Sequence, residues 1–252
     1  MDVLIVTLAS ALAGFVDSIV GGGGLILVPA LFATFPNAPP ATMLGTNKSA
    51  SVWGAAFSTW RYSRHVDMAW RTLLVAAVVT FIGACLGAWT VTQVSPALLR
   101  RALPFVLLVL LVYTLARKDL GREHDPRWHG LHERLLLSGM GLVIGFYDGF
   151  FGPGAGSFFV FFLVRVMGYD FLHASAGAKL LNTASNSAAL LAFTWTGHVW
   201  WHLALPLALA NILGSWLGTR LALQRGAGFV RNVFLLVVGA LILKTGYDGF
   251  LR

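Results

Sequence analysis

The sequence predicts an all-α polytopic membrane protein, made of two inverted repeats with about eight membrane segments in total. The first observation is composition, because 57% of the 252 residues are hydrophobic, only 11% are charged, and the mean hydropathy is +0.76. The others are an internal repeat and the placement of basic residues between apolar runs. A soluble domain has about 25% charged residues, so we expect the lipid bilayer to be the main solvent of this chain.

The repeat is clearest in two glycine-rich stretches. The stretch 14–24, GFVDSIVGGGG, returns 131 positions later as 145–156, GFYDGFFGPGAG. The same offset pairs Lys48 with Lys179 and Gly83 with Gly214. We therefore divide the chain into a first membrane repeat, a basic cytoplasmic linker and a second membrane repeat, at residues 1–116, 117–134 and 135–252. Internal duplication of this kind is typical of secondary transporters.

Apolar runs of about 20 residues predict the membrane segments. Six runs are expected to be single spans: 41–60, 72–92, 97–116, 174–194, 202–222 and 229–247. Two longer runs, 3–35 and 135–166, are divided by glycines into limbs of roughly 13 to 17 residues. At about 1.5 Å per residue such a limb is shorter than the hydrocarbon core of about 30 Å. We expect each long run to form a re-entrant hairpin, with a broken single span as the alternative.

Basic residues test these two topologies. With two hairpins, twelve Lys and Arg residues lie on one side of the membrane and four on the other, whereas two broken spans give ten and six. Cytoplasmic loops hold the excess of basic residues, so the hairpin topology orients the chain clearly in a bacterial inner membrane, with both termini periplasmic. Each half then has three full crossings, which makes the halves inverted relative to each other. The same placement between spans argues against nucleic acid as a partner.

Two lysines lie inside predicted spans. Lys48 and Lys179 occupy matching positions, and an ionisable group there normally faces a cavity or a partner because its burial in lipid is costly. The pair therefore predicts a site for a small anion. Lys179 shares a helix face with Asn182, Thr183 and Asn186. We expect the anion to be oriented by four polar side chains, those of Asn47, Ser51, Asn182 and Asn186.

The glycine runs have a structural and a functional interpretation. Structurally, glycine allows a sharp turn and close helix packing. Functionally, such a turn presents N–H groups at the start of a half-helix, where the dipole attracts anions. We expect N–H donors for the anion at Gly21, Gly22, Gly23, Gly152 and Gly154. A nucleotide-binding loop is disfavoured because no Gly-Lys-Ser/Thr follows these glycines.

Two acidic residues, Asp17 and Asp148, each lie four positions before the first glycine of a turn. One interpretation is that each neutralises the lysine of its own half or caps the short helix after the turn. Another is that each accepts a proton and couples transport to the proton gradient. Direct contact with an anionic substrate is least favoured, because it would require a protonated carboxyl group.

Other polar residues predict no enzyme, cofactor or metal site. His129 and His132 in the linker could share a helix face and bind a metal, but a solvated linker is favoured because no Cys accompanies them and the spacing does not recur. The single Cys85 excludes an internal disulfide. No Ser-His-Asp or His-Glu-x-x-His arrangement indicates an intramembrane enzyme.

The stretch 14–25 with Thr46-Asn47-Lys48, and the stretch 145–153 with residues 178–182, resemble the sulfite exporter TauE/SafE family and its YfcA-like branch. The resemblance covers nearly the whole chain. It implies a bacterial inner-membrane permease that exports small sulfur-containing anions such as sulfite or sulfonates.

Two alternatives to an anion exporter stay open. A cation carrier would centre on Asp17 and Asp148 and use the lysines as built-in counter-charges. A membrane scaffold or sensor that transports nothing would use the basic loop 117–134 as its partner surface. Small residues on several helices would permit a homodimer as readily as internal packing.

Overall fold

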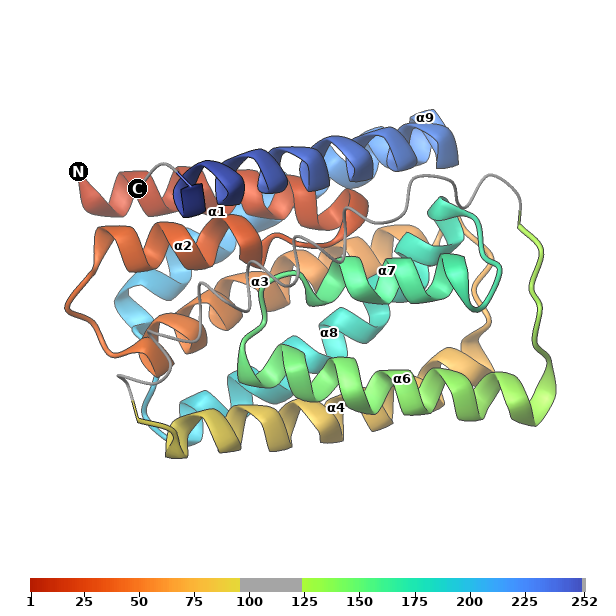
Figure 1. Ribbon diagram of the computed structural model, residues 1–252, viewed down its shortest axis with the longest axis horizontal. Helices are drawn as coiled ribbons and strands as arrows, with labels where there is room; N and C mark the ends of the chain where they lie inside the picture. Colours follow the sequence, from red (N-terminus) through yellow and green to blue (C-terminus); the bar gives the residue numbers. More distant parts are fainter. Residues whose placement is uncertain (96–123, 251–252) are drawn as a thin grey trace.

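A computed structural model describes residues 1–95 and 124–250, except for the side chains of 231 and 234–250, and every regular element in these ranges is an α-helix. The predicted all-α class is confirmed for this part of the chain. The helices lie along the long axis of one elongated bundle (Figure 1). They are α1 (Asp2–Val20), α2 (Gly24–Thr34), α3 (Pro40–Ser63), α4 (Trp70–Gln93), α6 (Gly130–Phe150), α7 (Ala155–Arg165), α8 (Phe171–Trp195) and α9 (Trp201–Phe250). The predicted span 97–116 lies outside the described residues.

Both glycine-rich stretches end a helix and turn the chain back. Gly21 ends α1 with a φ of 75°, and the turn between α6 and α7 contains Gly152 at 89° and Gly154 at 82°. Residues with a side chain rarely adopt such angles. In Figure 1, α2 runs back beside α1 and α7 runs back beside α6; the first hairpin opens to the left of the view and the second to the right.

The two limbs of each hairpin differ in length. The predicted limb length of roughly 13 to 17 residues is wrong for all four limbs. Helices α1 and α6 have 19 and 21 residues, whereas α2 and α7 have 11 each. At about 1.5 Å per residue, α1 is about 28 Å long and α2 about 16 Å. The first turn uses only the three residues between Val20 and Gly24, and α2 stops where Pro36 keeps Phe35 out of the helical conformation.

The two halves interleave instead of packing side by side. Helix α1 packs against α9, and α6 packs against α4. Glycines permit both contacts, since an added Cβ at Gly87 would overlap the carbonyl oxygen of Phe146, and one at Gly218 would overlap that of Phe15. Gly87 and Gly218 are 131 positions apart, as are Phe15 and Phe146. The same contact therefore occurs twice, each time joining the first helix of one half to α4, or to the matching part of α9, in the other half.

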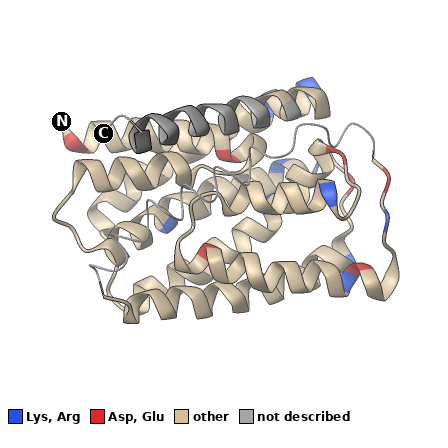
Figure 2. Cartoon of the chain, in the orientation of Figure 1, with Lys and Arg blue, Asp and Glu red and all other residues tan. Residues whose placement is uncertain are grey.

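Hydrophobicity and charge are unevenly distributed over the bundle. Among the described residues, α1 and α4 are long and apolar enough to cross a membrane, and α2 and α7 are shorter apolar helices. Charged residues are sparse along the helices and gather at one end, on the right of Figure 2. The predicted spans 202–222 and 229–247 both lie in α9, which consists of two helices separated by the non-helical residue Gly226, where φ is 70° and ψ is −169°.

Asp170 begins α8 at the charged end of the bundle. Its Oδ1 accepts hydrogen bonds from the backbone N–H groups of Leu172 and His173 at 2.7 and 2.9 Å, which is a typical helix N-cap. Burial would raise the pKa of the Asp170 carboxyl, but the hydrogen bonds and charge of His173, with the N–H of Leu172, outweigh burial and lower this pKa. The cap fixes the orientation of the carboxylate and the start of α8.

Candidate functional site

The two glycine-rich turns meet inside the bundle. An added Cβ at Gly24 would lie 3.2 Å from Pro153 Cα, and one at Gly156 would lie 2.8 Å from Gly21 Cα. Ser157 at the start of α7 donates a hydrogen bond to the carbonyl oxygen of Gly21 at 3.1 Å. Side chains on these glycines would separate the turns, so the glycines are required for the contact between the two halves.

Lys48 of α3 forms a buried ion pair with Asp148 of α6. The distance from Lys48 Nζ to Asp148 Oδ1 is 2.7 Å, and each side chain is 2% exposed. Lys48 Nζ also donates to Asn186 Oδ1 at 2.9 Å, and Ser185 Oγ donates to Asp148 Oδ2. Such partners are necessary because a charge buried without them is strongly disfavoured.

Lys179 of α8 forms the matching ion pair with Asp17 of α1. Lys179 Nζ lies 2.8 Å from Asp17 Oδ2, and the side chains are 0% and 15% exposed respectively. Asp17 also accepts hydrogen bonds from the N–H of Gly23 at 3.1 Å and from Asn182 Nδ2 at 3.4 Å. Asp17 is thus more exposed than Asp148, whose side chain is 2% exposed.

Each ion pair joins the two halves. The expectation that an aspartate neutralises the lysine of its own half is wrong, because Lys48 pairs with Asp148 and Lys179 pairs with Asp17. The reason is that the helices of the two halves interleave. Helix α1 brings Asp17 of the first half to α8, and helix α6 brings Asp148 of the second half to α3. The capping expectation agrees with the structure at Asp17, which accepts from Gly23, the N-cap residue of α2.

Two of the four polar residues expected to orient an anion belong to this cluster. Asn186 Nδ2 donates to Asn182 Oδ1 at 3.3 Å, so the two amides connect Lys48 on one side with Asp17 on the other. Asn47 is 3% exposed, and its Oδ1 has no hydrogen-bond partner among the residues that the structure describes. Ser51 is half-buried, and no hydrogen bond within the described ranges joins it to the charged residues. We refer to Asp17, Lys48, Asp148, Lys179, Asn182 and Asn186 as the central cluster.

Comparison with known proteins establishes the family. The sequence profile described as sulfite exporter TauE/SafE matches residues 6–245. The chain belongs to the TauE/SafE family. Its relatives include "Probable membrane transporter protein YfcA" of Escherichia coli (strain K12), 37% identical over 238 residues that cover 94% of this chain and 87% of the relative. "Probable membrane transporter protein ORF9" of Sinorhizobium sp is 36% identical over 238 residues, covering 94% and 89%.

A more distant relative is "Probable membrane transporter protein YunE" of Bacillus subtilis (strain 168), 22% identical over 275 residues that cover 99% of both chains. No solved structure matches the sequence. The family match over residues 6–245 confirms the resemblance to TauE/SafE sequences over nearly the whole chain.

Some backbone N–H groups of the two glycine-rich turns already donate hydrogen bonds within this TauE/SafE chain. Gly21 N–H donates to the carbonyl oxygen of Asp17 at 2.8 Å, Gly23 N–H donates to the Asp17 carboxylate, and Gly152 N–H donates to the carbonyl oxygen of Tyr147 at 3.3 Å. Three of the five glycines expected to bind an anion thus have internal acceptors. Within the described residues no acceptor is found for the N–H groups of Gly22 and Gly154.

The lysines of the central cluster retain donor capacity. An ammonium group can donate three hydrogen bonds. Among the described residues, Lys48 donates two hydrogen bonds, to Asp148 and Asn186, and Lys179 donates one, to Asp17.

Ser185 contacts the central cluster although the sequence analysis does not predict it as a site residue; it lies next to Asn186. Its position one residue from a predicted polar residue was the only signal, because its partner Asp148 belongs to another helix.

Proposed function

We propose that this TauE/SafE protein is a multi-pass transporter of the bacterial inner membrane that exports small anions, namely sulfite, sulfonates or related organosulfur anions. The observation that carries the proposal is the burial of two lysines, 2% and 0% exposed, between the halves of an apolar bundle. Ionisable groups at such depth are costly and generally mark a substrate or ion pathway. The family and the printed names of the relatives support transport.

The two halves are inverted repeats in this proposal, and both termini are periplasmic. Support comes from the hairpins that open toward opposite ends of the bundle and from the helix contact that recurs at positions 131 apart. Transport proceeds by alternating access around the central cluster, so that the site faces each side of the membrane in turn.

Anion binding requires the ion pairs to separate. Asp17 and Asp148 neutralise both lysines, so an incoming anion must compete with a carboxylate for each ammonium group. Protonation of an aspartate removes that competition and leaves a positive charge at the lysine. We therefore propose that a proton and an anion are transported together. Asp17 is the first proton acceptor, because it is 15% exposed whereas Asp148 is 2% exposed.

A cation carrier is the second candidate. Asp17 is the exposed member of its pair, at 15%, whereas Lys179 is fully buried. The acid, and not the lysine, is then the group that a cation could reach. In this case Lys48 and Lys179 serve as fixed counter-charges.

Flux through proteoliposomes distinguishes the two candidates. Wild-type protein should show saturable flux of sulfite or a sulfonate, and Lys48→Ala/Lys179→Ala should abolish it. Asp17→Asn should retain anion flux and lose its dependence on a pH gradient. Arg71→Ala is the control for loss of a basic residue, because this arginine is exposed at the start of α4 and takes no part in the two ion pairs.

The anion proposal is refuted if the double lysine variant, folded as judged by size-exclusion chromatography, transports sulfite at the wild-type rate. Cation flux that Asp17→Asn abolishes and the lysine variant retains would establish the cation carrier instead.

A further inference from the structure

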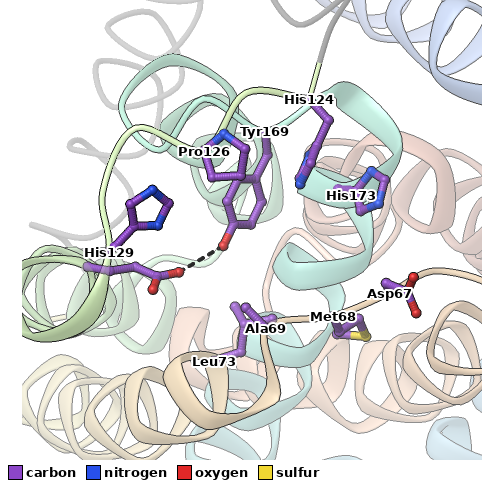
Figure 3. Close-up of a pocket in the computed structure, with 10 residues that line it drawn as sticks. Asp67, Met68, Ala69, Leu73, His124, Pro126, His129, Tyr169 and His173 are labelled. Atoms are coloured by element: carbon purple, nitrogen blue, oxygen red, sulfur yellow. Dashed lines mark hydrogen bonds between the residues drawn. The ribbon is translucent and has the colours of Figure 1, made fainter.

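A second polar site lies at the charged end of the bundle, away from the central cluster. A cavity of about 270 Å³ there is lined by ten residues, among them three histidines and two carboxylates. Figure 3 shows His124 and His173 side by side on one wall and His129 on another. Tyr169 Oη donates a hydrogen bond to Glu133 Oε1 at 3.1 Å, and both residues line the cavity.

The wall that carries His124 is held in place by the backbone. The N–H of Asp125 donates to the carbonyl oxygen of Gly168 at 2.9 Å, and that of Arg127 donates to Met167 at 3.0 Å. Trp128 Nε1 donates to the carbonyl oxygen of Val166 at 3.0 Å. Gly168 has a φ of 83°, and an added Cβ would overlap the carbonyl oxygen of Asp125. Residues 124–128 are thus fastened to the turn between α7 and α8.

This attachment brings three metal-ligating residues together. One potential ligand atom from each of His124, Asp170 and His173 lies within 4.8 Å of the other two. Asp170 Oδ2 is 2.6 Å from His173 Nδ1 and 3.8 Å from His124 Nδ1. The centroids of the two imidazole rings are 4.0 Å apart. Because Oδ1 of Asp170 caps α8, the carboxylate is fixed with Oδ2 toward both histidines.

We propose that His124, Asp170 and His173 bind one divalent transition-metal ion. Two imidazoles and one carboxylate suit Zn²⁺ and similar ions, whereas Mg²⁺ and Ca²⁺ prefer sites made of oxygen ligands. The cavity beside the three residues leaves room for the remaining ligands. The bound ion ties residues 124–128 to the start of α8, the helix that carries Lys179.

The proposed site differs from the metal site considered in the sequence analysis. There, helical spacing makes His129 and His132 a possible metal-binding pair, but a solvated linker without metal is the favoured interpretation. His132 is exposed and is not among the three ligating residues. The partners of His124 lie more than forty positions away in the sequence, so only the fold brings them together.

Metal titration of the full chain tests the proposal. The protein is purified in detergent without a histidine tag, stripped with a chelator and titrated with Zn²⁺ by calorimetry. We expect one Zn²⁺ per wild-type chain, with the same stoichiometry and affinity in the control His132→Ala. His124→Ala and His173→Ala should each weaken binding about 10-fold or more. Asp170→Asn should weaken binding as well, although asparagine still caps α8.

The expected thermal signature is a rise in Tm with Zn²⁺ that Mg²⁺ does not produce, since a ligand that binds only the folded chain stabilises it. Absence of saturable Zn²⁺ binding by the wild-type chain would overturn the proposal. So would wild-type affinity in a folded His124→Ala/His173→Ala variant. His124 lies in an exposed segment, so its replacement tests binding without disturbing the helices.

Discussion

Replacing Lys48 alone should destabilise the protein far more than replacing Lys48 together with its ion-pair partner. The distance from Lys48 Nζ to Asp148 Oδ1 is 2.7 Å, and both side chains are 2% exposed. Removal of one member of a buried pair typically costs about 3–5 kcal/mol, because an uncompensated charge remains, whereas replacement of both can be nearly neutral. In Lys48→Met, Asp148 keeps its hydrogen bond from Ser185. We therefore expect a loss near the lower limit, about 3 kcal/mol.

A double-mutant cycle shows which aspartate is the partner. Lys48→Met/Asp148→Asn should recover most of the stability lost in Lys48→Met, because no charge remains unpaired at this position. Lys48→Met/Asp17→Asn is the matched control within one half. It should be less stable than Lys48→Met, since both Asp148 and Lys179 then lack their partners.

The assay is the free energy of unfolding in mixed micelles as the denaturing detergent increases, with helicity and a proteolysis readout as independent probes. Coupling between Lys48 and Asp17 without coupling between Lys48 and Asp148 would refute the pairing across the halves. Losses that simply add in both cycles, with no coupling energy, would show that the charges of the central cluster do not interact.

Two further predictions concern packing and capping. Gly87→Ala should lower the free energy of unfolding by about 1–3 kcal/mol, because the added Cβ overlaps the carbonyl oxygen of Phe146; Gly139→Ala, with no atom within 4 Å of the added Cβ, is the control and should cause no loss. Equal Tm values for the two variants would contradict the close packing of α4 and α6. Asp170→Ala should cost about 0.5–2 kcal/mol by removing the cap of α8, and Asp170→Asn much less. The same unfolding assay measures both, and identical losses would mean that the cap is not formed.

Local features of the fold could be predicted from the sequence. The glycine-rich stretches interrupt helices because their positive φ angles are accessible mainly to glycine. The polar face of α8 follows from helical periodicity, and Lys179, Asn182 and Asn186 all belong to the central cluster. Limb lengths could not be predicted, since composition does not show how few residues the first turn requires.

Contacts between the halves could not be predicted from the sequence. The partner of Lys48 lies 100 positions away and that of Lys179 lies 162 positions away, and no spacing rule connects residues so distant. Duplication showed that two lysines and two aspartates are equivalent, but pairing within a half satisfies this symmetry as well as pairing between halves. Only the packing of α1 on α9 and of α6 on α4 decides between them.

The exchange of ion-pair partners has a consequence for biosynthesis. Lys48 leaves the ribosome 100 residues before Asp148, and Asp17 leaves it 162 residues before Lys179. At about 5–20 residues per second, Lys48 waits on the order of 5–20 seconds for its partner. The nascent first half must keep both charges hydrated or sheltered by the insertion machinery until the second half arrives. Both ion pairs therefore form only after the second half has been made, and we expect a chain truncated between the halves to expose two unpaired charges to membrane quality control.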